Sequence, residues 1–215
     1  GARTTVEFGM GDGRVAAALI NDGAPAYLGG ATSPEVGHAA RARLAERAHA
    51  RDVHLLEADM LKPLPPSTAP FDAAILTANT MYCTPRHSEL IARVAEALAP
   101  GGVFALDVYN PLPWHLAEVE DADADDAPLG DDEEAAGGLS EDDLLVVVED
   151  ELGREWSVYE RDPEVDTEVQ TVVCRYDFHC ASAGGLREEL VHYYVLPEQL
   201  VVLLDEGGFA IERID

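Results

Sequence analysis

The sequence predicts an α/β protein: a doubly wound, Rossmann-like, mostly parallel sheet that carries a small antiparallel β insertion. Two patterns lead to this prediction. Over residues 4–111, short apolar strands alternate with helical segments, which is typical of a parallel sheet covered by helices on both faces. Over residues 144–195, strand-like segments follow one another with only turns between them, which indicates antiparallel pairing.

The parallel part is expected to hold alternating strands and helices. The strands are expected at residues 4–8, 26–28, 53–56, 71–76 and 103–108, and the helices at residues 15–20, 33–50 and 86–99. Ser33 is a good N-cap and Pro34 suits the first helical position, so the second helix begins there. Residues 86–99 repeat apolar side chains at helical spacing, and Pro100-Gly101-Gly102 is expected to end that helix.

The antiparallel part follows a strongly acidic stretch. Its strands are expected at residues 144–148, 155–159, 169–178 and 186–195. A helix over residues 197–205 and a strand over residues 209–214 then return to the parallel sheet. The chain is therefore expected to divide into a core at 1–111, an acidic loop at 112–143, the β insertion at 144–195 and the last core elements at 196–215.

The composition excludes some classes of partner. Asp and Glu number 42 against 14 Lys and Arg, a formal net charge of −28. Binding to a phosphate backbone needs cationic side chains, so we expect no nucleic-acid partner, and an anionic membrane surface is equally unsuitable. No run of about 18 apolar residues occurs, and the first residues do not resemble a secretory signal. Cys83, Cys174 and Cys180 form no disulfide framework, so we expect free thiols and a cytoplasmic protein.

The acidity is concentrated in one stretch but not confined to it. Residues 118–143 contain thirteen acids and no Lys or Arg, which indicates a solvated loop. The net charge of −28 falls only to −15 when these thirteen acids are left out. Lys62 is the only lysine, and an acidic, nearly lysine-free surface resembles that of proteins from salt-accumulating halophiles. The alternative is an acidic loop that docks a cationic partner.

The motif that carries most chemistry lies between the first strand and the first helix. Val6-Glu7-Phe8-Gly9-Met10-Gly11-Asp12-Gly13 places an acid before three alternating glycines. Glycines allow tight turns and close approach of a ligand to the backbone at a helix N-terminus. A dinucleotide fingerprint needs glycine at the sixth position of GxGxxG, where this chain has Arg14. The motif therefore points away from NAD, although a plain glycine-rich turn is the alternative.

The surroundings of this motif give it a more specific meaning. Residues 4–111 resemble a class I S-adenosylmethionine-dependent methyltransferase. The resemblance rests, in chain order, on residues 7–13, Ser33-Pro34-Glu35, Glu57-Ala58-Asp59-Met60, residues 71–76 and residues 98–104. Residues 107–215 more loosely resemble small-molecule methyltransferases that insert an antiparallel sheet on the acceptor side. The resemblance implies a Rossmann-like methyltransferase fold.

The resemblance also implies the cofactor S-adenosyl-L-methionine and its contacts. The implied positions are Glu7, Gly9, Gly11, Ala31, Asp59, Met60, Thr77 and Ala78. The backbone of the two glycines would approach the methionine part, and Glu7 would orient the loop or reach the cationic ammonium group. Asp59 would accept a hydrogen bond from the adenine amino group, and the Met60 amide would meet the ring. The last two positions, just past the fourth strand, would line the pocket near the reacting methyl.

One position departs from the family. Where the family usually has an acid at the end of its second strand, bidentate to the ribose hydroxyls, this chain has Ala31. The loss of a charge-assisted hydrogen bond costs about 1.5–3 kcal/mol, a roughly 10–150-fold loss of affinity, unless Thr32 or water substitutes.

The acceptor side is less specific. An amine acceptor needs only to be neutral, whereas a hydroxyl acceptor needs a base, for which His192 is a candidate, with Tyr109 a second catalytic candidate. The residues that would line an acceptor pocket are Tyr82, Tyr109, Asn110, Trp114, His192 and Tyr194, each with core packing as the alternative. His179 with Cys174 and Cys180 lacks metal-ligand spacing, so no metal is expected.

The sequence thus predicts an enzyme that transfers a methyl group from S-adenosylmethionine to a nitrogen or oxygen of a small-molecule acceptor. Its oligomeric state stays open. A degenerate methyltransferase-fold module that binds cofactor or a partner without catalysis is the alternative, and Ala31 favours it. A dehydrogenase is a more distant third.

The charge predicts salt-dependent stability. The Debye length is roughly 10 Å at 0.1 M salt and roughly 3 Å at 1 M, so added salt screens the repulsion among 42 acids and should raise the melting temperature. A variant without residues 118–143 keeps a charge of −15, so its salt dependence should weaken and persist. Melting curves of both proteins from low to molar salt test this. A melting temperature indifferent to salt would refute the halophilic interpretation.

Overall fold

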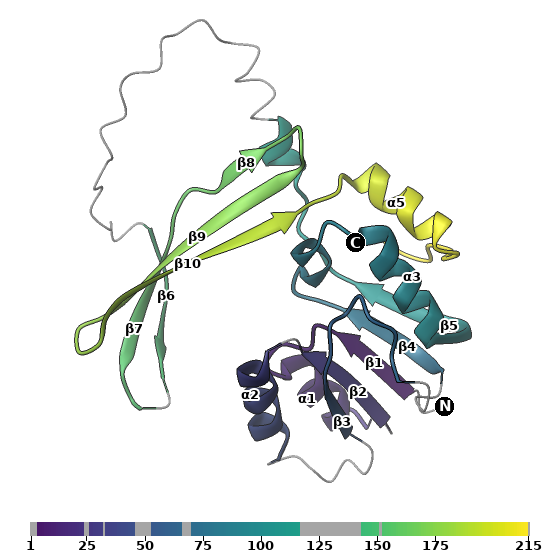
Figure 1. Ribbon diagram of the computed structural model, residues 1–215, viewed down its shortest axis with the longest axis horizontal. Helices are drawn as coiled ribbons and strands as arrows, with labels where there is room; N and C mark the ends of the chain where they lie inside the picture. The colour runs from purple at the N-terminus through teal and green to yellow at the C-terminus, as the bar shows by residue number, and fades with distance from the viewer. Residues whose placement is uncertain are drawn as a thin grey trace, which may run out of the picture. The chain divides into compact units, whose positions relative to one another are not determined.

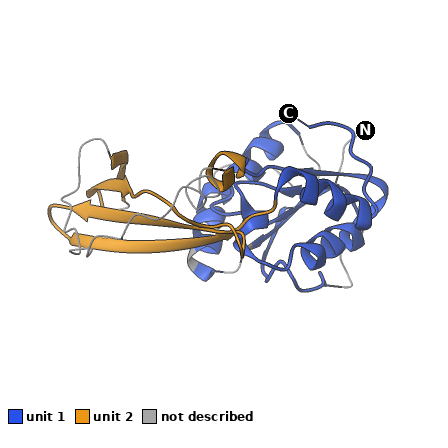
Figure 2. Ribbon diagram, turned by 90° about the horizontal axis from the view of Figure 1, so that it is seen from above, with its two compact units in different colours: residues 1–110, 196–215 blue, residues 111–195 orange. Residues whose placement is uncertain are grey.

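The computed structural model describes residues 4–23, 26–31, 33–45, 53–65, 70–116, 143–150 and 152–214. The chain divides into two compact units (Figure 2). The core unit comprises residues 1–110 and 196–215, and the insertion unit comprises residues 111–195. The predicted acidic loop at 112–143 is wrong at its start, because residues 112–116 form a short helix. Residues 117–142 of the predicted loop lie outside the described residues. Within the described part of the chain, no helix is long and apolar enough to cross a membrane.

The core unit is built on a five-stranded sheet in the order β3-β2-β1-β4-β5 (Figure 1). The strands are β1 (Thr4–Phe8), β2 (Ala26–Ala31), β3 (Val53–Glu57), β4 (Phe71–Leu76) and β5 (Leu98–Leu106). All neighbouring strands pair in parallel, which confirms the predicted doubly wound sheet. The chain moves outward from β1 to β3 and then returns to the other side of β1 with β4. Ligands of such sheets bind at the carboxyl ends of the strands near this reversal.

Helices cover the sheet in two groups. They are α1 (Arg14–Asn21), α2 (Pro34–Ala45), the short 3-10 helix η1 (Thr80–Cys83), α3 (His87–Ala97) and α5 (Pro197–Glu206). α1 and α2 contact each other and β2, whereas α3 contacts β4, β5 and α5. Ser33 caps α2 as predicted, because its Oγ accepts a hydrogen bond from the Val36 N–H at 3.4 Å. The predicted end of this helix, residues 46–50, lies outside the described residues.

Two predicted boundaries in the core unit are wrong. β5 begins at Leu98, whereas the sequence predicts a helix to residue 99 and a turn at 100–102. Leu98 pairs with Phe71 of β4, and the register then shifts, so the Pro-Gly-Gly segment is an irregular part of the strand. Residues 209–214, which the sequence predicts as a last strand, pair with none of the described strands. Phe209 packs against Phe104 with the ring centroids 5.2 Å apart, whereas Ile211 and Ile214 are 41% and 75% exposed.

The insertion unit is an antiparallel sheet, as predicted. Its strands are β6 (Leu144–Glu149), β7 (Glu155–Glu160), β8 (Glu164–Asp166), β9 (Thr171–Cys180) and β10 (Gly184–Tyr193). The order is β10-β9-β7-β6, and β8 pairs with the first part of β9. The three-residue strand β8 was not predicted, because Pro163 and the polar residues around it read as a turn.

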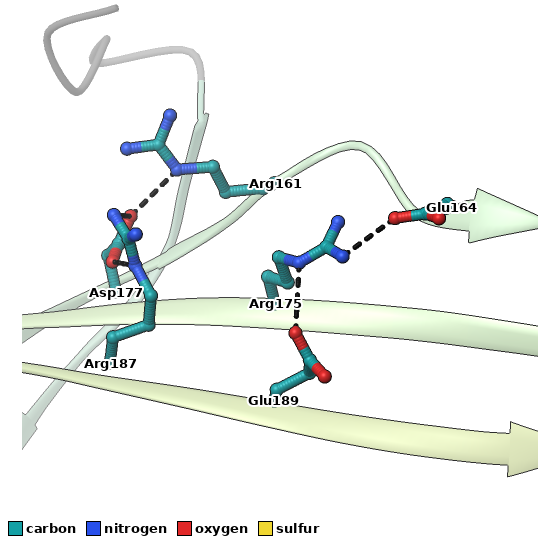
Figure 3. Close-up of polar contacts among 6 residues, drawn as sticks. All are labelled: Arg161, Glu164, Arg175, Asp177, Arg187 and Glu189. Carbon is teal, nitrogen blue, oxygen red and sulfur yellow. Dashed lines mark hydrogen bonds and ion pairs between the residues drawn. The ribbon is translucent and has the colours of Figure 1, made fainter. Parts of the chain in front are cut away.

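Ion pairs cross the strands of this sheet (Figure 3). Asp177 is 6% exposed and accepts hydrogen bonds from Nε of both Arg187 and Arg161, each at 2.7 Å. The hydrogen bonds from these two guanidinium groups, Arg187 first, hold the pKa of Asp177 below its ordinary value. Arg175 bonds Glu164 at 2.7 Å and Glu189 at 3.1 Å, so one side chain joins β8, β9 and β10. The ion pair between Arg175 and Glu164 therefore links the short strand β8 to β9.

Candidate functional site

A pocket opens at the carboxyl ends of β1, β2 and β3. It holds about 310 Å³ of space, the open solvent at its mouth included. The lining residues are Val6, Glu7, Phe8, Gly9, Leu28, Gly30, Leu56, Ala58, Asp59, Met60, Lys62 and Leu64. The structure thus brings four of the predicted cofactor contacts, Glu7, Gly9, Asp59 and Met60, around one pocket within the core unit.

The glycine loop between β1 and α1 needs its glycines for backbone conformation. Gly9, Gly11 and Gly13 have φ angles of 71°, 54° and 78°, which side chains other than glycine adopt rarely. A Cβ at Gly9 would also lie 2.3 Å from the Thr80 side chain. The predicted contact Gly11 is exposed, and it is not among the residues that line the pocket. The Met10 N–H donates to the Gly30 carbonyl at 3.0 Å, which ties the loop to the end of β2.

Glu7 is one of the residues that line the pocket, and it is almost completely buried. Only 2% of the residue is exposed, and its carboxyl accepts hydrogen bonds from the Tyr27 hydroxyl and from Thr77 Oγ1, the latter at 3.5 Å. Burial raises the pKa of Glu7 to about 7, although both hydrogen bonds act in the opposite direction. Glu7 therefore titrates near neutral pH, unlike an ordinary glutamic acid.

The turn after β3 is shaped by Asp59. Its Oδ1 accepts the Leu61 N–H at 2.9 Å, and its carbonyl accepts the Lys62 N–H at 3.0 Å. These bonds fix the backbone of the segment that carries Met60 and Lys62 along the pocket.

The predicted contact Ala31 is the last residue of β2, where it pairs with Glu57 of β3. This places the position at the same sheet edge as the pocket, but its side chain lies outside the described residues. β2 therefore ends without the acidic residue that the family usually has at this position.

The loop after β4 is held in an unusual backbone conformation. Ala78 and Asn79 have φ angles of 54° and 57°, which cost energy in residues other than glycine. The Asn79 N–H donates to Asp107 Oδ1 at 3.3 Å, and its side-chain oxygen accepts the Tyr109 N–H at 2.8 Å. Asn79, which the sequence analysis missed, thus joins the ends of β4 and β5. Thr77 contacts Glu7, but neither Thr77 nor Ala78 is among the lining residues.

The predicted acceptor residues fall into both units. In the core unit, the Tyr82 hydroxyl donates to the Tyr109 carbonyl at 3.3 Å, and the two rings stack edge to face at 5.0 Å. Tyr82 is 1% exposed, so packing accounts for it, while Asn110 is exposed.

In the insertion unit, the Tyr194 hydroxyl lies 2.8 Å from His115 Nδ1, and Trp114 is 39% exposed. His192 is buried in β10, and burial lowers its pKa, which favours the neutral imidazole.

Cys180 contacts the Ser182 hydroxyl. Across the described residues, no group of three His, Cys, Asp or Glu side chains is arranged to hold a metal ion.

The pocket residues fit the cofactor that the sequence implies. Leu28, Leu56 and Leu64 give the pocket apolar walls for an adenine ring. Gly30 has room beside it, since a Cβ there would meet nothing closer than 3.8 Å. Glu7 has no cationic side chain within ion-pair distance among the described residues, so a positively charged ligand would supply its counterion.

Comparisons with known proteins agree with this geometry. Residues 6–102 match a family described as methyltransferase domain. No curated protein matches the sequence significantly. The CcbJ methyltransferase from Streptomyces caelestis shares 20% identity over 96% of this chain and 72% of its own, with a TM-score of 0.68.

Two further solved structures have the same fold. CalS10, an amino pentose methyltransferase from Micromonospora echinaspora solved with S-adenosylmethionine bound, is 20% identical over 96% of this chain and 75% of its own, with a TM-score of 0.63. The sugar N-methyltransferase KedS8 from Streptoalloteichus is 21% identical over 97% and 72%, with a TM-score of 0.62. At these identities the likeness shows a shared methyltransferase fold.

A side chain at position 30 tests the pocket. Gly30→Val places a branched side chain in the space that the ligand would use, and the strand conformation at this position is open to any residue. We expect Gly30→Val to reduce S-adenosylhomocysteine affinity at least tenfold, about 1.4 kcal/mol, in a folded protein, with a smaller loss for Gly30→Ala. Calorimetric titration measures both. Unchanged affinity in a folded Gly30→Val protein would place the ligand elsewhere.

Burial of Glu7 predicts a pH-dependent stability. Its folded pKa of about 7 lies above the ordinary value of 4.5, so the folded state keeps a proton that the unfolded state loses. Stability should therefore fall as the pH rises from about 5 to 8, by about 2–3 kcal/mol from this group. Glu7→Gln cannot ionise and keeps an acceptor for Tyr27, so its stability relative to wild type should rise over this range. Urea unfolding at pH 5 and pH 8 measures the difference, and a constant difference would contradict the assignment.

Proposed function

We propose that this chain binds S-adenosylmethionine and methylates the amino group of a small molecule, with amino sugars as the acceptor class. The match of residues 6–102 to a methyltransferase domain supports the reaction type. Two neighbours in fold support the acceptor class. CalS10 is described as an amino pentose methyltransferase and KedS8 as a sugar N-methyltransferase.

The pocket around Glu7 is the observation that carries the proposal. The cofactor supplies an activated methyl group on a sulfonium, so the protein has mainly to position the reactants and keep water out. The glycine loop offers backbone at Gly9, leucine side chains line the pocket, and Glu7 contributes a buried carboxyl. The sequence-implied roles of Asp59 and Met60 at the adenine ring agree with their place in the lining.

The acceptor atom is proposed from acid–base chemistry. A neutral amine attacks without help from a base, whereas a hydroxyl must lose its proton. His192, held neutral by burial, is the base that a hydroxyl acceptor would use, and Tyr109 is the second candidate near the end of β5. Methylation of a hydroxyl is therefore the second candidate reaction.

A matched pair of acceptors tests the proposal. The full chain is incubated with S-adenosylmethionine and either an amino sugar or the same sugar with a hydroxyl in place of the amine, in low and in molar salt. We expect S-adenosylhomocysteine release and a methylated product with the amine alone. Because the amine needs no base, His192→Phe should leave its methylation largely intact.

Other outcomes select the alternatives. Methylation of the hydroxyl sugar, abolished in His192→Phe, would overturn the amine assignment in favour of hydroxyl methylation. Cofactor binding without transfer to any member of a panel of amino and hydroxy sugars would favour a binding module over an enzyme.

A further inference from the structure

Tyr27 is a fully buried polar residue to which the sequence analysis gives no role. It lies in β2, is 1% exposed, and donates its hydroxyl to the carboxyl of Glu7 in β1. Gly29 leaves room for the Tyr27 side chain to extend to Glu7. Gly29 pairs with Glu7 in the sheet, and a Cβ there would lie 2.9 Å from the Tyr27 hydroxyl. The missing side chain thus leaves the space through which Tyr27 meets Glu7.

Among the residues that the structure describes, no cationic side chain pairs directly with the Glu7 carboxyl. Two hydroxyls face it, that of Tyr27 from β2 and that of Thr77 from the end of β4. Arg14 of α1 favours the ionised form from a longer distance, and Asp12 of the glycine loop disfavours it. Asp12 is itself paired with Arg43 of α2.

Two more charged groups, Asp59 and Lys62, line the same pocket. No ion pair to Glu7 is formed by any of the described cationic side chains. A buried carboxyl in this setting holds a proton near neutral pH, and a cation in the pocket would change that balance.

We propose that Tyr27 is a positioning residue that holds Glu7 beneath the pocket, and that cofactor binding there releases the proton of Glu7 to solvent. The carboxylate that remains accepts the Tyr27 hydroxyl and faces the positive charge of the ligand. The inference rests on the cofactor assignment of the proposed function and is independent of the acceptor. It makes cofactor affinity depend on pH, because only the ionised carboxyl attracts the ligand.

The size of the effect follows from proton linkage. With a pKa of about 7 in the free protein and ionised Glu7 in the complex, affinity should be about tenfold tighter at pH 8 than at pH 6. At pH 7, about half a proton should be released for each ligand bound. Tyr27→Phe removes a hydrogen bond that favours the carboxylate. The midpoint of the pH profile should therefore move to higher pH, and affinity at pH 7 should fall.

The experiment is calorimetric titration of the full chain with S-adenosylhomocysteine from pH 6 to pH 8, in two buffers of different ionisation enthalpy. Wild type, Tyr27→Phe and Glu7→Gln are compared with Tyr176→Phe. Tyr176 is a matched control because its hydroxyl also donates to a glutamate, Glu160, but in the insertion unit. We expect ligand binding to release protons in wild type and in Tyr176→Phe. In Tyr27→Phe, the midpoint of the pH profile of affinity should lie at higher pH. In Glu7→Gln, no proton should be released from this site.

The outcomes separate this inference from the function. Binding by wild type that neither releases a proton nor changes with pH would overturn the inference and leave the function standing. The inference also fails if proton release persists in Glu7→Gln, or if a folded Tyr27→Phe binds more weakly with an unmoved midpoint. Absence of binding by wild type at every pH and salt concentration would overturn the cofactor assignment as well. If Tyr27→Phe does not fold, the comparison of wild type with Glu7→Gln still tests whether Glu7 releases the proton.

Discussion

The hydrogen bond between Glu7 and Tyr27 is the constraint around which the site is arranged. A carboxyl that is 2% exposed in the central strand of a sheet must be compensated, and two hydroxyls do this, that of Tyr27 in β2 and that of Thr77 just after β4. The arrangement needs Gly29 beside it, since any side chain there would meet the phenol ring. The strand that carries the glycine loop is thereby bound through its side chain to both neighbours.

The loops that follow these strands are held by hydrogen bonds at the carboxyl ends of the strands. The glycine loop is tied to β2 through the Met10 N–H, and the loop after β4 is tied to β5 through Asn79. The positive φ angles of Ala78 and Asn79 are a conformational cost that these hydrogen bonds offset. Loops held in this way suit the positioning of a ligand at the carboxyl ends of the strands.

The sequence was sufficient for the architecture, because strand and helix periodicities reflect burial directly. Four of the eight cofactor contacts that the resemblance implies, Glu7, Gly9, Asp59 and Met60, line one pocket, since motifs in a fixed order specify which loops meet. Their role in cofactor binding stays a prediction. Predictions from the sequence were wrong where tertiary contacts determine the ends of an element. β5 starts early because Leu98 pairs with Phe71, and residues 209–214 pair with none of the described strands. The role of Tyr27 was equally hidden, because it depends on which residue of β1 lies opposite Gly29, a register that no local pattern encodes.

The most direct test is the ionisation of Glu7 itself, followed by carbon NMR of the labelled side-chain carboxyl and assigned with Glu7→Gln. We expect a midpoint near pH 7 in the free protein, and a midpoint well below it when S-adenosylhomocysteine is bound. A carboxyl that titrates near the ordinary value of 4.5 in the free protein, with no change on ligand addition, would contradict it.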